Sequence, residues 1–292
     1  MNRRKFIKAG ALGLAGISVL QSGMAGVHFA LPYEGTVDKV ALGNSGLTAS
    51  RIAMGSGSKG GNKSSNQTRI GMDNFKRLAL HAYERGIRFY DTADSYGSIP
   101  YVGESIKTLP RKELTLLTKM WTHDDGSNNV ESVEDNITRY LKEFGTDYID
   151  ILLMHCMMSG DWATKRTHYM EGFAKAKKAG KVRAVGVSCH DIGALREAAV
   201  NPWVDVIMAR INPFQTLMDG TPDEIKEILG RAKANGKGVI GMKIFGEGKN
   251  VSDEEREQSI RFALTEANIH CMTLGLESVE QMDDAIERVM RK

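Results

Sequence analysis

Cysteine is scarce in this chain of 292 residues, and the three cysteines present follow no pairing pattern. Cys156, Cys189 and Cys271 are an odd and widely spaced set, which excludes a disulfide framework. No C-x-x-C pair occurs anywhere in the sequence. Nothing therefore indicates a structural zinc site or an iron–sulfur cluster.

A net positive charge is also lacking outside the N-terminal segment. The formal net charge is +3, but residues 1–30 carry four cationic side chains and no acid, so the remaining chain stands at −1. A basic balance confined to the first residues leaves no surface pattern typical of nucleic-acid binding. We therefore expect no nucleic-acid partner.

Long apolar runs are missing as well. The Gly- and Ala-rich stretch at 9–25 is too short and too weakly apolar for a spanning helix. It follows N-R-R-K-F-I-K at 2–8, which resembles a twin-arginine export signal. We expect residues 1–30 to be an export signal and linker read by the twin-arginine machinery. The protein is then periplasmic or otherwise exported, with no stable transmembrane span after processing; an uncleaved leader that anchors it to the membrane is the alternative.

Residues 31–292 contain no linker, repeat or low-complexity block and are expected to form one domain. Short apolar runs predict strands at 50–56, 87–91, 114–119, 149–155, 182–188, 204–211, 238–243 and 270–275. Helical patterns lie between them, such as those at 73–85, 130–144, 163–179, 223–235 and 253–266. This alternation predicts an α/β fold, a (β/α)8 TIM barrel. A doubly wound open sheet is the alternative, but its G-x-G-x-x-G is absent after the first strand.

Four polar residues lie at or just beyond the ends of three successive predicted strands, where catalytic groups of such barrels gather. They are Asp91, Tyr96, Lys119 and His155. A phenol with a pKa near ~10 must be acidified to donate a proton well at neutral pH. We expect Lys119 to lower the pKa of Tyr96, Asp91 to keep the lysine charged and aimed, and His155 to orient a substrate oxygen. The set predicts a carbonyl-protonating site whose partner is a hydride donor, although a rim lysine or a core histidine alone is common.

The heptapeptide D-T-A-D-S-Y-G at 91–97 matches the D-T-A-x-x-Y-G signature of the aldo-keto reductases, and the chain resembles that family from about residue 40 onward. L-G-N-S-G-L at 42–47 resembles the hairpin that closes the barrel bottom in the family. The resemblance implies an NAD(P)-dependent enzyme that reduces a small-molecule aldehyde or ketone and is reversible with the alcohol. The alternative is an accessory or sensory subunit that binds cofactor on the same fold and has slow chemistry.

The resemblance also implies an NAD(P)H site across the barrel mouth. The residues that it assigns there are Gly55, Ser56, Asp91, Ser188, Cys189, Gln215, Lys243, Gly246, Gly275, Glu277, Gln281 and Asp284. Cys189 replaces an asparagine of the family, and a thiol is a weak donor. Glu277 stands where NADPH-preferring relatives often carry Arg, Lys or Ser. Because a carboxylate repels a 2′-phosphate and can accept hydrogen bonds from a ribose diol, we expect tolerance of NADH.

Two further features lie beside the predicted site. Trp121 follows the third strand and is expected to face the substrate pocket, where it stacks on substrate or packs a lid. H-C-M-M at 155–158 is a candidate copper cluster in an exported protein. The other methionines are spread through strands and helices as core residues, so no metal is expected.

Overall fold

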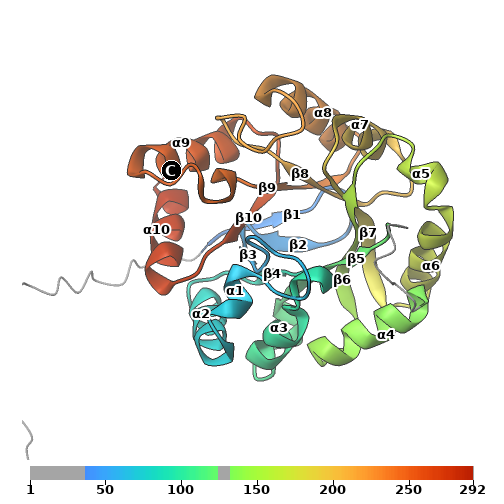
Figure 1. The fold of residues 1–292 in the computed structure, drawn as a ribbon, viewed down its shortest axis with the longest axis horizontal. Helices are drawn as coiled ribbons and strands as arrows, with labels where there is room; N and C mark the ends of the chain where they lie inside the picture. The colour runs from blue at the N-terminus through green and yellow to red at the C-terminus, as the bar shows by residue number, and fades with distance from the viewer. Residues whose placement is uncertain (1–36, 124–131, 292) are drawn as a thin grey trace, which may run out of the picture. The chain divides into compact units, whose positions relative to one another are not determined.

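The structure is a computed structural model that describes residues 37–123 and 132–291. Eight parallel strands form a closed barrel, which β10 completes by pairing with both β9 and β3 (Figure 1). The barrel strands are β3 Ile52–Gly55, β4 Phe89–Asp91, β5 Thr115–Trp121, β6 Ile149–Met157, β7 Val182–Cys189, β8 Val206–Arg210, β9 Gly238–Met242 and β10 Cys271–Gly275. The predicted TIM barrel is confirmed. The export leader predicted at 1–30 lies outside the described residues.

A short antiparallel hairpin precedes the barrel. Its strands are β1 Lys39–Ala41 and β2 Thr48–Ser50, and they lie within the ring of barrel strands in the view of Figure 1. Leu42 and Leu47 at its turn are buried among the residues of the barrel interior. The hairpin thus closes one end of the barrel, as the resemblance implied.

The strand predicted at 50–56 is wrong in one respect, because it is divided at Arg51. The Arg51 backbone N–H donates to the Asp38 carbonyl at 2.9 Å, and its guanidinium is 2.7 Å from the Asp38 carboxylate. These contacts hold Ser50 and Arg51 to the hairpin. The barrel strand therefore begins only at Ile52.

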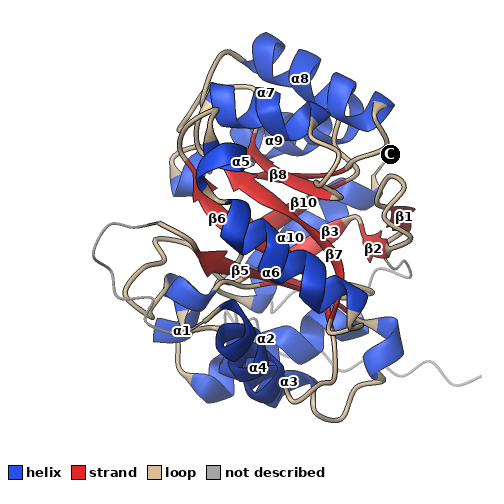
Figure 2. Cartoon of the chain, turned by 90° about the vertical axis from the view of Figure 1, so that its right-hand side faces the viewer, coloured by secondary structure: helices blue, strands red, loops and turns tan. Residues whose placement is uncertain are grey.

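Ten α-helices surround the barrel in the described part of the chain (Figure 2). They are α1 Asn66–Arg69, α2 Met72–Glu84, α3 Ile99–Ile106, α4 Val133–Phe144, α5 Trp162–Lys165, α6 Thr167–Lys178, α7 Ile192–Val200, α8 Pro222–Ala234, α9 Asp253–Thr265 and α10 Val279–Met290. The helix predicted at 163–179 is wrong in its first turn. Arg166, at φ −115° and ψ 22°, leaves the helical region and separates α5 from α6. Capping boxes begin α8 at Thr221 and α9 at Ser252, the start chemistry expected for such helices.

The barrel strands are buried on both faces. One apolar cluster fills the interior, with Phe89, Leu117 and Ile151 among its members, and a second packs between the strands and the helices. This burial explains why the strands are continuous apolar runs rather than alternating ones. No helix in the described ranges is long and apolar enough to cross a membrane.

Candidate active site

A buried ion pair joins the ends of β4 and β5. The Lys119 side chain is about 2% exposed, and its Nζ donates both to Asp91 Oδ1 and, at 2.8 Å, to the Thr92 carbonyl. Thr273 Oγ1 donates to the other carboxylate oxygen of Asp91 at 2.8 Å. A charge buried alone would cost several kcal/mol, so each of these partners is needed to hold the pair inside the barrel. Asp91 thus holds the end of the Lys119 side chain in place, and its predicted effect on the charge of Lys119 stays a prediction.

Tyr96 stands above this pair in the short 3-10 helix Asp94–Tyr96 that follows β4. Its hydroxyl is 3.3 Å from His155 Nε2, and Lys119 Nζ lies 5.0 Å from the centroid of its ring. The backbone of the β3–α1 segment passes close over the ring: a Cβ on Gly57 would meet Tyr96 Cε2 at 2.1 Å, and one on Gly60 would meet Cδ1 at 2.5 Å. Only glycine leaves room for the phenol here. The four residues predicted as a catalytic set are brought together.

The predicted effect of Lys119 on Tyr96 is wrong for this arrangement. Burial, with a further contribution from the Asp91 carboxylate, holds the pKa of the Tyr96 hydroxyl well above its usual value of 10.0. The reason is that Lys119 forms its ion pair with Asp91, and no hydrogen bond from its Nζ to the Tyr96 hydroxyl is recorded among the described residues. Burial, aided by the charge of Lys119, lowers the pKa of His155 well below 6.5. At neutral pH the site therefore presents a protonated phenol beside a neutral imidazole.

Aromatic rings cover the other side of His155. The Trp121 ring meets it edge to face at 5.6 Å between centroids and lies 4.5 Å from the ring of His123. His123 Nε2 is 2.7 Å from the Cys156 carbonyl, which fixes the imidazole at the end of β6. The Trp121 ring thus contacts His155, one of the four residues of the predicted catalytic set. Its role toward substrate stays a prediction.

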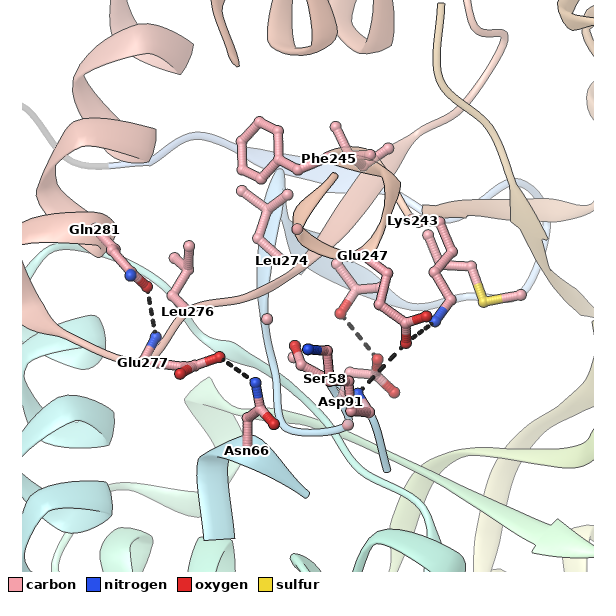
Figure 3. Close-up of a pocket in the computed structure, with 18 of the residues that line it drawn as sticks. Ser58, Asn66, Asp91, Lys243, Phe245, Glu247, Leu274, Leu276, Glu277 and Gln281 are labelled. Carbon is pink, nitrogen blue, oxygen red and sulfur yellow. Dashed lines mark hydrogen bonds and ion pairs between the residues drawn. The ribbon is translucent and has the colours of Figure 1, made fainter. Parts of the chain in front are cut away.

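A cavity of about 580 Å³ runs from this set toward α10 (Figure 3). Its lining includes Asp91, Tyr96 and Lys119 at one end. Of the other residues assigned to cofactor binding, it includes Gly55, Lys243, Gly275, Glu277, Gln281 and Asp284. The volume is in the range of ordinary small-molecule sites. One continuous space therefore joins the proton donor to most of the predicted cofactor residues.

Two predicted cofactor residues have side chains engaged within the protein. Ser56 is buried, and its hydroxyl donates to the Asp91 carbonyl at 2.7 Å. Ser188 is also buried, and its Oγ accepts from the Cys156 backbone N–H at 2.9 Å. Both serines tie neighbouring strand ends together at the barrel mouth. Their contact with cofactor stays a prediction.

Three others lie outside the lining of the cavity. Cys189 is fully buried, and burial raises the pKa of its thiol. Gln215 is exposed in the β8–α8 loop with a left-handed backbone, φ 58°. Gly246 is in the β9–α9 loop that borders the cavity, and its φ of 56° with Asn250 Oδ1 only 2.3 Å from a would-be Cβ requires glycine. These three assignments also stay predictions.

The β9–α9 loop presents charged groups to the middle of the cavity. Lys243 forms an ion pair with Glu247, which also accepts from the Lys59 backbone N–H at 3.4 Å (Figure 3). Burial alone would raise the pKa of Glu247, but the hydrogen bond and charge of Lys243 hold it below its usual value. Lys243 and Glu247 both adopt positive φ, so the backbone of the loop turns tightly at both residues and is not extended.

The far end of the cavity is acidic. Asn66 Nδ2 donates to Glu277 Oε1 at 2.6 Å, and the Glu277 backbone N–H donates to Gln281 Oε1 at 2.8 Å. Asp284 lies 3.0 Å from Arg256 and 2.8 Å from Arg288. Its carboxylate is therefore held by two guanidinium groups rather than left open to the cavity.

Among the lining residues that sequence reasoning missed are Lys59, Asn66 and Arg256. Lys59 and Asn66 belong to the segment after β3, and Arg256 is a half-buried residue of α9. None stands in a motif or at a strand end. Only the three-dimensional fold brings them to the cavity.

Known proteins resemble this chain in sequence. A model of the Aldo/keto reductase family matches residues 51–292. The NADH-specific methylglyoxal reductase of Escherichia coli is 27% identical over 219 residues, which cover 68% of this chain and 64% of that protein. A methylglyoxal reductase of Salmonella typhi is 28% identical over 59% of this chain and 62% of its own length. The matched regions thus span less than two thirds of both relatives. The L-galactose dehydrogenase of Arabidopsis thaliana is 24% identical over 85% of this chain and 87% of that protein.

Solved structures share the fold. An aldo-keto reductase from Bacillus halodurans, determined in its holo form, superimposes with a TM-score of 0.69 at 17% identity, covering 88% of this chain and 92% of that one. An aldo/keto reductase from Brucella melitensis gives a TM-score of 0.66 at 21% identity, covering 88% and 95%. At these identities the likeness shows the barrel alone.

Proposed function

We propose that this chain, which belongs to the aldo/keto reductase family, is an NAD(P)H-dependent oxidoreductase that reduces an aldehyde or ketone and is reversible with the alcohol. One observation carries the proposal. The Tyr96 hydroxyl, kept protonated by burial, lies 3.3 Å from His155 over the buried Asp91–Lys119 pair, at one end of the long cavity. Without a nucleophile of lowered pKa in this set, proton donation is the chemistry that it supports best.

The residues of the cavity fit a nicotinamide dinucleotide. When bound, NAD(P)H supplies the hydride. Lys243, Lys59 and the tight turn at 243–248 stand at the middle of the cavity, where cations and backbone N–H groups suit phosphates. Glu277 stands at the far end, where a carboxylate can accept from ribose hydroxyls.

The protein's own groups perform the proton half of the reaction. His155, a neutral imidazole, positions the carbonyl oxygen next to the Tyr96 hydroxyl. As negative charge develops on that oxygen, the phenol gives up its proton to it. An alkoxide is a stronger base than a phenolate, so the transfer is downhill even from a phenol of raised pKa. Lys119, whose Nζ lies 5.0 Å from the centroid of the ring, then offsets part of the phenolate charge.

The charge of the cavity supports NADH in preference to NADPH. Glu277 and Glu280 line its far end, and neither forms an ion pair recorded among the described residues, so negative charge stands there before a dinucleotide enters. The 2′-phosphate of NADPH adds about two negative charges beside Glu277. Like charges at ~4 Å repel by up to about 4 kcal/mol at an effective dielectric of 20, and a quarter of that is about fivefold in affinity.

Small 2-oxoaldehydes are the substrates to try first, because two relatives are named methylglyoxal reductases. The test is to measure NADH and NADPH consumption by the purified protein with methylglyoxal and a panel of simple aldehydes and ketones. Turnover that requires both a carbonyl and a dinucleotide supports the proposal. Tight dinucleotide binding without turnover on any carbonyl would instead favour the accessory or sensory subunit.

We also propose that residues 1–30 direct export by the twin-arginine route. The support is the sequence N-R-R-K-F-I-K at 2–8 and the weakly apolar stretch after it. Export in the folded state lets a dinucleotide cross already bound. Dinucleotide retained by protein purified from the exported fraction, seen by absorbance and mass analysis, would support this route of supply.

A further inference from the structure

The Asn66–Glu277 hydrogen bond connects two segments far apart in the sequence. Asn66 begins α1, and Glu277 lies in the loop between β10 and α10 (Figure 3). The 2.6 Å contact occupies Glu277 Oε1, whereas no protein donor to Oε2 is recorded among the described residues. One carboxylate oxygen is thus fixed and the other is left for a ligand in the cavity.

Further hydrogen bonds hold both partners of this contact in place. The Asn66 backbone N–H donates to the Ser58 carbonyl at 2.9 Å, and its Oδ1 accepts from Arg69. Its neighbours Ser65 and Gln67 are fully buried, and Ser65 forms the capping box of α1. On the other side, the Glu277 backbone donates to Gln281 at 2.8 Å. The amide is therefore a fixed donor, since the backbone that carries it has little freedom to move.

We infer that Asn66 is a positioning residue that sets the cofactor preference of the site by fixing the Glu277 carboxylate. The inference rests on the proposed function, because it needs a dinucleotide whose ribose meets Glu277. With Oε1 held by Asn66, Oε2 has one orientation in which to accept from a ribose diol. The same orientation keeps the full negative charge where a 2′-phosphate would lie. Without the amide, an exposed glutamate rotates freely, which weakens the diol contact and relieves the repulsion.

The test is cofactor affinity rather than activity. Dissociation constants for NADH and NADPH are measured by fluorescence titration on wild type, Asn66→Ala, Glu277→Gln and the double variant. We expect Asn66→Ala to weaken NADH about threefold to tenfold, less than the full worth of a charge-assisted hydrogen bond because the diol contact is weakened and not removed, and to leave NADPH unchanged or tighter. In the Glu277→Gln background the same substitution should have little effect on either cofactor, because its effect acts through the carboxylate.

Asn74 supplies a matched control. It also accepts from an arginine three residues on, Arg77, and donates to a backbone carbonyl, that of Ile70 at 2.8 Å, but it lies outside the cavity lining. Asn74→Ala should leave both affinities unchanged. If Asn66→Ala does not fold, Asn66→Asp carries the same test, because its carboxylate repels Glu277 at nearly the same volume.

The possible results distinguish a failure of this inference from a failure of the proposed function. An equal loss of NADH and NADPH affinity in Asn66→Ala, or an NADH loss that persists in the Glu277→Gln background, would mean that Asn66 only supports α1, and would overturn this inference alone. A wild type that binds neither dinucleotide would contradict the proposed function, and this inference with it. A shift in the ratio of the two affinities that disappears with Glu277 establishes the positioning role.

Discussion

Lys119 donates to the Asp91 carboxylate inside the barrel and faces the Tyr96 ring from 5.0 Å, rather than meeting its hydroxyl. The ammonium is therefore paired with Asp91 and acts on the phenol only across the 5.0 Å to the centroid of its ring. Asp91 in turn is tied to β10 by Thr273 at 2.8 Å. The pair connects three strands of the barrel, so its charge balance matters for stability as well as for chemistry.

Lys119→Met should destabilise the fold and abolish reduction. Removing one partner leaves the buried Asp91 carboxylate unpaired, which costs about 3–5 kcal/mol in comparable sites. The measurement is the free energy of unfolding in urea together with kcat. Adding Asp91→Asn to Lys119→Met should restore part of the stability but not the activity. If Lys119→Met alone is as stable as wild type, the buried Asp91 carboxylate does not depend on Lys119 to offset its charge.

The pH profile should follow the neutral forms of Tyr96 and His155. Reduction needs the protonated phenol, whose pKa is raised well above 10.0, so the rate should not fall until the pH exceeds 10. The pKa of His155 is lowered well below 6.5, so the imidazole gains a proton only in acid, and the rate should not fall near pH 6.5 either. Alcohol oxidation needs the phenolate and should rise with pH up to 10 without a plateau. A reduction profile with an alkaline limb between pH 7 and 9 would mean that the phenol is acidified after all.

Gly57→Ala should impair catalysis through the position of Tyr96. The new methyl would meet the phenol ring at 2.1 Å, which forces the ring or the β3–α1 segment to move. A displacement of about 1 Å at the reacting group costs about a hundredfold in rate. Gly61→Ala is the control, because a Cβ there has no atom within 4 Å. Steady-state kinetics on both variants decide it, and equal activity in the two would show that the ring position is not critical.

Export should depend on the paired arginines and not on charge. Changing Arg3 and Arg4 to lysine should leave folded, active protein in the cytoplasm, because a receptor reads the pair. Lys5→Arg, a charge-preserving change outside the pair, should leave export intact. Cell fractionation with immunoblotting measures the distribution. If the paired substitution and wild type have the same distribution, residues 1–30 act only as a basic tail and not as a twin-arginine signal.

The sequence predicts the barrel and the ends of its strands well, because both depend on local pattern. Apolar runs buried on two faces predict the strands, and the polar residue that closes each run predicts Asp91 and Lys119 at the mouth. The same logic predicts His155, although the strands of Lys119 and His155 each continue two residues further, to Trp121 and Met157. The break between α5 and α6 was missed, because nothing in the pattern indicates the non-helical backbone at Arg166.

Contacts between loops could not be predicted from the sequence. Whether Lys119 meets the hydroxyl or the ring of Tyr96 depends on the path of the loop after β4, which no periodicity describes. Ser56 and Ser188 match family motifs, yet their hydroxyl groups bond to neighbouring strand ends. Asn66 reaches Glu277 only because the chain folds back after β3. Motifs predict which residue types gather at the mouth, and packing decides which atoms they contact.

The most direct test of the central claim is the reduction kinetics of Tyr96→Phe with its dinucleotide affinity measured in parallel. The substitution removes one oxygen atom and keeps the ring under Gly57 and Gly60. If Tyr96 donates the proton, kcat should fall ~10²–10⁴-fold, the usual worth of general acid catalysis, while the affinity for NADH stays within about twofold. A kcat within threefold of wild type would contradict the account, because another group would then have to protonate the carbonyl.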